Sequence, residues 1–269
     1  LGLGPIPHNL MFSSPPDIPL QNRDGSERYV ASHFPLPADR ARHVGQPIAM
    51  VIAETFSEAK DAAELVNVDY APLTPVIDTS GAAETGSSVV WPDRGSNVAI
   101  DADVNDFRGS SAILEEAAHV VHLNTTLSRV TGIPMEPRSA VGNIDVDGRY
   151  ILQTTGGSIY RFKRELADLF NESEDHFRVI IRDVGGSYGP RNALYVEHPL
   201  VLWAARRTGR PVKWTSDRTE SMLTDYQARD LIIDASLGFD AGGNIVGLHT
   251  QNTSNIGAFS ASWLPLVKG

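Results

Sequence analysis

The sequence predicts a mixed α/β protein of the α+β class, and three patterns support this prediction. Residues 48–53 form a continuous apolar run, which is typical of a strand buried on both faces. Residues 177–214 have the pattern of a strand, a glycine turn, a helix and a second strand, and residues 231–253 contain two alternating segments around a tight turn. With 269 residues, of which 41% are hydrophobic, the chain can form one large or two ordinary domains.

The composition disfavours several kinds of function. A net charge of −10, with no Lys/Arg run among aromatic residues, argues against a nucleic-acid partner. Cys is absent, so these residues hold no disulfide, thiolate nucleophile or Cys-ligated cluster, and redox chemistry needs a borrowed cofactor. No apolar run has membrane-spanning length and no leader pattern is present. Because the chain starts at Leu1 rather than Met, we expect an incomplete or cleaved polypeptide.

The N-terminal part is expected to contain a compact β-α-β piece. Residues 1–40 carry seven prolines and no sustained period, which predicts an extended surface arm. After the apolar strand at 48–53, Thr55 and Glu58 have the spacing of a capping box and predict a helix start. Alternation at residues 66–70 predicts the second strand.

A domain boundary is predicted at residues 81–111, where apolar residues no longer recur at helical or strand spacing. We divide the chain into a first domain at residues 1–80, a linker at 81–111 and a second domain at 112–269. The second domain is expected to open with a short helix at 112–118 and a strand at 119–130.

Two pairs of side chains in this region suggest sites, and neither pattern is strong. His119 and His122 could ligate a metal, but residues three apart on a strand face opposite sides, which disfavours a shared ion. Glu136 and Arg138 lie between two prolines. We interpret them as an ion pair oriented by a rigid turn, in preference to a direct catalytic role.

The remaining pattern predicts that strands and helices alternate. We expect a strand that ends at residues 154–155, a helix at 159–170, the central strand at 177–184, a helix that starts at Pro190, a short helix at 217–222 and the hairpin at 231–253.

The glycine loop at residues 185–189 is the candidate ligand site. Glycines before a helix start leave backbone N–H groups open, and the helix dipole would favour an anion or phosphate there. The alternative is a sharp structural turn, since this loop is neither a dinucleotide fingerprint nor a Walker loop. Gly156 and Gly157 follow the preceding strand, so both strand ends are expected near each other, as where open α/β sheets bind ligands.

Five segments together carry a resemblance to a known family. Their order and spacing resemble the large, molybdenum-binding subunit of the xanthine oxidase family, which includes carbon monoxide dehydrogenases and aldehyde or heterocycle hydroxylases; the segments are residues 44–49, 64–70, 134–138, 185–189 and 209–213. The resemblance implies the later part of an α/β hammerhead domain, followed by the first part of a molybdenum-cofactor domain.

The resemblance also implies a function and partners. Such a chain would bind molybdenum on molybdopterin, as the cytosine dinucleotide in bacterial members. It would hydroxylate an aldehyde or heterocycle, or oxidise carbon monoxide. Electrons would pass to an iron–sulfur small subunit and an FAD medium subunit, in a dimer of heterotrimers in the cytoplasm or periplasm. The lack of Cys agrees with iron–sulfur clusters on a partner chain.

The same resemblance implies which residues contact the cofactor and where this chain departs from the family. The expected cofactor-binding positions are Gly157, Gly185, Gly186, Ser187, Tyr188 and Gly189, and none is expected to ligate the metal directly. Gly157 stands where the family often has a Gln, and Tyr188 stands where it usually has Phe. Pro190 and Arg191 change the stiffness and reach of the loop.

Two further points follow from the family pattern. Asn192 corresponds to a Glu of purine hydroxylases, which disfavours purines as substrates. The family's general-base Glu corresponds to a position beyond residue 269, so no catalytic residue is assigned here and the fragment alone is expected to be inactive. A nucleotide-binding module and a non-catalytic assembly subunit remain alternative functions.

Overall fold

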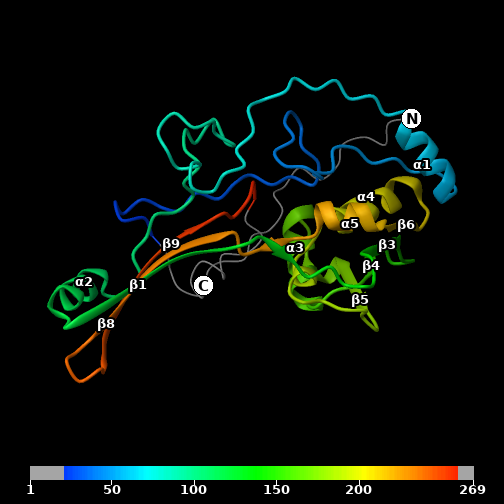
Figure 1. The fold of residues 1–269 in the computed structure, drawn as a ribbon. Coiled ribbons are helices and arrows are strands. Elements are labelled where there is room, and N and C mark those ends of the chain that lie inside the picture. Colours follow the sequence, from blue (N-terminus) through cyan, green and yellow to red (C-terminus); the bar gives the residue numbers. More distant parts are fainter. Residues whose placement is uncertain (1–20, 260–269) are drawn as a thin grey trace. The chain divides into compact units, whose positions relative to one another are not determined.

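The computed structural model describes residues 21–259 and contains two compact units, each made of separate stretches of chain (Figure 1). Within the described range, the first unit comprises residues 32–72 and 131–226, and the second comprises residues 21–31, 73–130 and 227–259. Residues 1–20, half of the expected N-terminal arm, lie outside the described residues. The stretch 81–111, predicted to be a linker, is part of the second unit.

A four-stranded sheet forms the centre of the first unit, in the order β5-β4-β3-β6. Strand β3 is antiparallel to both β4 and β6, whereas β4 and β5 are parallel. The strands are β3 (Ser139–Ile144), β4 (Tyr150–Thr154), β5 (Phe177–Ile181) and β6 (Val212–Thr215). The two predicted strands that correspond to β4 and β5 are thus neighbours, and the prediction that their ends lie near each other is confirmed.

Two long helices, α3 and α4, pack against this sheet. Helix α3 (Ile159–Phe170) begins at the capping hydroxyl of Ser158 and ends at Asn171 in the left-handed conformation. Helix α4 (Glu197–Thr208) is buried on most sides and packs against β3 at Gly142, where a Cβ would lie 2.4 Å from the carbonyl oxygen of Val201. The predicted helix at 159–170 is confirmed.

The prediction that a long helix starts at Pro190 is wrong, because the helix starts seven residues later, at Glu197. Pro190 opens only a short 3-10 turn, η2 (Pro190–Asn192), and the chain is extended at Ala193 before α4 begins at Glu197. Proline favours the first turn of a helix, but here the side chain of Arg191 is buried and the backbone is already extended at Ala193. The glycine loop therefore does not precede the N-terminus of a long helix.

The N-terminal stretch of the first unit, residues 32–72, contains one helix and no strand. Helix α1 (Phe56–Glu64) has the predicted capping box, in which Thr55 and Glu58 bond reciprocally. The strands predicted at 48–53 and 66–70 are wrong. A strand needs a hydrogen-bonded neighbour, and neither segment has one among the described residues.

Smaller elements complete the first unit. Helix α5 (Arg218–Thr224) is capped by Asp217, which confirms the short helix predicted at 217–222. A second 3-10 turn, η1 (Glu174–His176), leads into β5.

The second unit is built on a three-stranded antiparallel sheet, in the order β1-β8-β9. Its strands are β1 (His119–Leu127), β8 (Leu231–Phe239) and β9 (Ile245–Ser254), which confirms the predicted hairpin. Helix α2 (Phe107–Glu116) packs on one face, where Leu114 would lie 2.8 Å from a Cβ at Gly238. The short strands β2 (Val130–Thr131) and β7 (Gln227–Ala228) lie where the chain passes between units.

Two expectations about metals and membranes can be compared with the described part of the chain. His122 bonds the hydroxyl of Ser236 across the sheet, at 2.8 Å. Residues 21–259 contain no group of three or more His, Cys, Asp or Glu side chains that could hold a metal ion. Over the same residues, no helix has both the length and the apolar character needed to span a bilayer.

Candidate functional site

The candidate site lies at one edge of the sheet in the first unit, where two parallel strands end. Thr154 of β4 pairs with Ile181 of β5, so both strands point their carboxyl ends to the same edge. Gly156 and Gly157 follow β4, and the loop 185–189 follows β5. We call Gly157 together with residues 185–189 the glycine edge. The carboxyl edge of parallel strands is a common place for ligands in α/β folds.

The loop of the glycine edge is open to solvent and adopts unusual backbone angles. Gly186, Tyr188 and Gly189 have φ angles of 117°, 49° and 100°. Tyr188 is 76% exposed. Among residues 21–259, no protein acceptor receives a hydrogen bond from the N–H groups of residues 186–189. Successive free N–H groups in a turn with left-handed residues form a concave site for anions or electron-rich oxygens.

Glu136 fixes the start of this loop. Its carboxylate accepts a hydrogen bond from the N–H of Gly185 at 2.7 Å, and a Cβ at Gly185 would lie 2.5 Å from the Cβ of Glu136. The predicted ion pair between Glu136 and Arg138 is therefore wrong. Successive residues around Pro137 point to different places, so that Glu136 reaches the loop and Arg138 reaches the interior.

Arg191 joins the two glycine segments through backbone and hydroxyl oxygens. Its side chain is buried, and it donates to the Thr155 hydroxyl at 2.8 Å and to the Glu136 carbonyl at 2.6 Å. Its own carbonyl accepts from the N–H of Gly157 at 3.1 Å. Burial lowers the pKa of Arg191 below its ordinary value. We call these contacts the Arg191 clamp.

Asn192, the next residue, fills the space beside Gly157. A Cβ at Gly157 would lie 1.8 Å from the Oδ1 atom of Asn192. Both residues are exposed, and the Asn192 N–H donates to the carbonyl of Gly189 at 3.0 Å. Within the described chain, the Asn192 carboxamide bonds to no protein group. It therefore presents free polar atoms between the two glycine segments.

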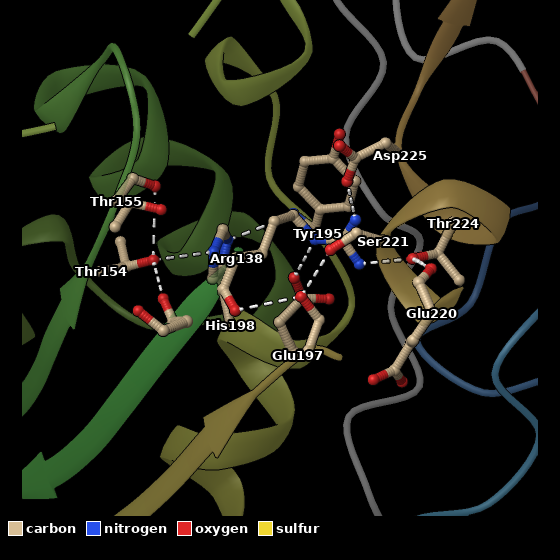
Figure 2. Close-up of polar contacts among 12 residues, drawn as sticks. Arg138, Thr154, Thr155, Tyr195, Glu197, His198, Glu220, Ser221, Thr224 and Asp225 are labelled. Atoms are coloured by element: carbon tan, nitrogen blue, oxygen red, sulfur yellow. Dashed lines mark hydrogen bonds and ion pairs between the residues drawn. The ribbon is translucent and has the colours of Figure 1, made fainter. Parts of the chain in front are cut away.

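A buried charged cluster lies in the same unit, around Arg138 (Figure 2). The guanidinium donates to Glu197 at 2.7 Å, to Thr224 at 2.6 Å, and to Asp225, and it stacks 4.1 Å from the ring centroid of Tyr195. Burial by itself would lower the pKa of Arg138, but Glu197, Tyr195 and Asp225 together outweigh burial and raise it. We call these residues the Arg138 cluster.

His198 connects the Arg138 cluster region to the end of β4. Its Nδ1 atom accepts from the N–H of Tyr195 at 3.2 Å, so the neutral ring carries its proton on Nε2, which donates to the Thr154 hydroxyl at 3.1 Å. Thr154 in turn donates to the carbonyl of Ser139 at 2.7 Å. Burial lowers the pKa of His198 to about 4, so the ring is neutral at pH 7. It holds the strand end rigidly.

The structure thus places all six predicted site residues at the ends of two neighbouring strands, and it adds others that the sequence pattern missed. Gly157, Gly185, Gly186, Ser187, Tyr188 and Gly189 lie on the two neighbouring segments. Arg191 and Asn192 were noted only as departures from a family pattern. The partners of Arg138 lie 59 and 87 positions away in the sequence, and no local pattern connects them.

Comparisons with known families match nearly the whole chain. Residues 90–268 match the molybdopterin cofactor-binding domain, and residues 10–74 match the a/b hammerhead domain of aldehyde oxidase and xanthine dehydrogenase.

Individual relatives agree with these matches. The gamma subunit of the 6-hydroxypseudooxynicotine dehydrogenase complex of Paenarthrobacter nicotinovorans is 35% identical over 88% of this chain and 29% of its own length. The large chain of carbon monoxide dehydrogenase of Hydrogenophaga pseudoflava is 28% identical over 80% of this chain and 28% of its own. The solved structure of quinoline 2-oxidoreductase from Pseudomonas putida 86 is 28% identical, with a TM-score of 0.75, over 82% of this chain and 28% of its own. The chain spans less than a third of each of these relatives.

Proposed function

The chain belongs to the family of molybdenum-binding large subunits of the xanthine oxidase type, and we propose that its glycine edge lines the molybdopterin site. The observation that carries the proposal is the loop 185–189, in which the N–H groups of residues 186–189 have no protein acceptor in the described residues. Such a loop suits a ligand rich in oxygen and charge, as a pterin phosphate or a metal oxo group is.

The backbone geometry fits a large flat ligand. Gly189 has a φ of 100° and open space where a Cβ would point, and Gly186 has a φ of 117°. Residues without side chains let a ligand approach the backbone closely. The Arg191 clamp and Glu136 hold both glycine segments in place, so the surface is formed before a ligand binds.

This chain's own residues would bind and orient rather than react. The bound cofactor would supply the two-electron redox chemistry. The glycine edge would supply hydrogen-bond donors, and His198 would hold the end of β4 as a neutral ring. We assign no general base to the described residues.

We propose the finer identity from the resemblance and the names of the relatives. The cofactor is the cytosine dinucleotide form, and the reaction is hydroxylation of an aldehyde or heterocycle, or oxidation of carbon monoxide. Electrons leave to iron–sulfur and FAD partner chains. Asn192, in place of the purine hydroxylases' Glu, disfavours a purine substrate.

Metal and pterin analysis of the natively purified protein tests the proposal. Elemental analysis should find molybdenum in proportion to the chain, and acid hydrolysis should release a pterin and a cytidine nucleotide. A folded native preparation without molybdenum would contradict the proposal.

A non-catalytic assembly subunit is the second candidate, and Gly157 favours it. Glycine offers no side chain to a cofactor at the position where the family often has Gln. The same analysis separates the two functions, because an assembly subunit should carry partner chains and no molybdenum. A nucleotide-binding function is no longer favoured. It depended on a long helix directly after the glycine loop, and only the three-residue turn η2 follows the loop.

A further inference from the structure

The side chain of Asn192 fills the space that a side chain at position 157 would need. A Cβ at position 157 would lie 1.8 Å from the Asn192 Oδ1 and 3.0 Å from its Cγ. Real atoms do not approach so closely, so a side chain at 157 and the present rotamer of Asn192 exclude each other. Only one of the two positions can place polar atoms in this space.

Asn192 uses this space from a firm backbone position. Its N–H donates to the carbonyl of Gly189 at 3.0 Å, and the neighbouring Arg191 is held by the Arg191 clamp. Its carboxamide is exposed, and no protein group in the described residues bonds to it. A carboxamide can both donate and accept, which suits a pterin with groups of both kinds.

We propose that the Asn192 carboxamide is a cofactor-contacting group of the glycine edge, and that Gly157 is glycine because Asn192 requires its space. The inference rests on the proposed function, because the ligand in question is the molybdopterin. The presence of glycine at position 157, where the family often has Gln, is then a consequence of Asn192. The polar group that position 157 lacks is supplied from position 192.

The pair predicts a particular pattern of variant effects. Asn192→Ala removes the carboxamide directly. Gly157→Ala adds a methyl group that displaces it, and the fold tolerates this because the carboxamide is the end of a flexible, exposed side chain. Both single variants therefore lose the same contact, and the double variant should lose no more than either.

The test measures retention of molybdenum and pterin during prolonged dialysis of the native complex. Each single variant should lose cofactor roughly three- to tenfold faster than the parent, the range expected for one hydrogen bond. The double variant should match the singles. The swap Gly157→Gln with Asn192→Gly should retain cofactor better than Asn192→Gly alone.

Gly148→Ala is the matched control, because Gly148 lies in the turn between β3 and β4 in the same unit, with no atom near the added methyl group. Thermal unfolding of every variant identifies loss of fold separately. Additive losses, or a Gly157→Ala protein that retains cofactor like the parent, would overturn the inference. A parent complex without molybdenum would overturn the proposed function as well, so the two failures are distinguishable.

Discussion

Two buried arginines of the first unit, Arg138 and Arg191, differ in the charge of the groups to which they bond. Arg138 bonds to the carboxylates of Glu197 and Asp225, and these partners with Tyr195 raise its pKa. Arg191 bonds to a hydroxyl and a carbonyl, and burial lowers its pKa. Its Nε atom is buried without an acceptor among the described residues.

The difference separates a structural function from a site function. Compensated charges inside the Arg138 cluster hold helices α4 and α5 to the turn before β3. Among the described residues, no carboxylate bonds directly to the Arg191 side chain. It bonds instead to the Thr155 hydroxyl and to the carbonyl of Glu136, the residue whose carboxylate holds Gly185. We therefore expect changes at Arg138 to affect folding above all, and changes at Arg191 to affect cofactor retention as well.

The largest expected effect follows Arg138→Met. The substitution leaves two buried carboxylates unpaired, and the free energy of unfolding should fall by about 3–5 kcal/mol. Chemical denaturation measures this loss. Arg149→Met is the control, since Arg149 pairs with Asp145 at the surface and its loss should cost about 0–1 kcal/mol. Equal losses for the two variants would remove the distinction between the two arginines.

The free energy of unfolding should depend on pH in a way that reveals the lowered pKa of His198. Burial lowers its pKa from 6.5 to about 4, so the unfolded chain binds more protons between these values. The stabilising effect is complete above pH 6.5 and falls as pH decreases towards 4, by about 3 kcal/mol in all. His33, whose pKa burial also lowers to about 4, should contribute in the same range.

Denaturation at several pH values checks this prediction. His198→Gln should flatten the fall between pH 6.5 and 4 without abolishing it, because His33 remains. An unchanged slope for His198→Gln would show that His198 is protonated alike in both states.

Arg191→Met should cost less stability and more function than Arg138→Met. It leaves neutral acceptors at Thr155 and Glu136 without partners, which costs about 1–3 kcal/mol. The freed glycine edge should bind cofactor less well, so molybdenum per folded chain should fall. A folded Arg191→Met protein with full molybdenum would show that the Arg191 clamp does not serve the site.

The smallest expected effect compares two glycines with left-handed angles. Gly189 and Gly148 have φ angles of 100° and 81°, and neither has an atom near the position of a Cβ. Alanine at either position should cost about 1 kcal/mol of stability from backbone strain. Only Gly189→Ala should also lower molybdenum content. Equal molybdenum content in both would argue that the loop does not contact the cofactor.

Sequence patterns predicted the local elements well where the partners were close in the chain. The capping box at Thr55, the helix at 159–170 and the hairpin at 231–253 each follow from signals within a few residues. The family matches confirm the predicted hammerhead and molybdenum-cofactor regions. The strand predicted at 48–53 failed because strand formation depends on a distant neighbour that no local pattern reveals.

The site was predictable in its backbone and not in its side chains. Glycine clusters after two successive strands indicated the edge, since parallel strands end together. The Arg191 clamp and the Arg138 cluster depend on side chains that cross between segments. Pro190 gave a misleading signal, because its fixed φ suits the first turn of a long helix and of a three-residue turn equally.

An experimental density map of the natively purified complex would test the central claim most directly. We expect pterin and molybdenum density in contact with the backbone of residues 186–189. Density of another protein segment packed on that backbone, with the pterin elsewhere or absent, would contradict the account.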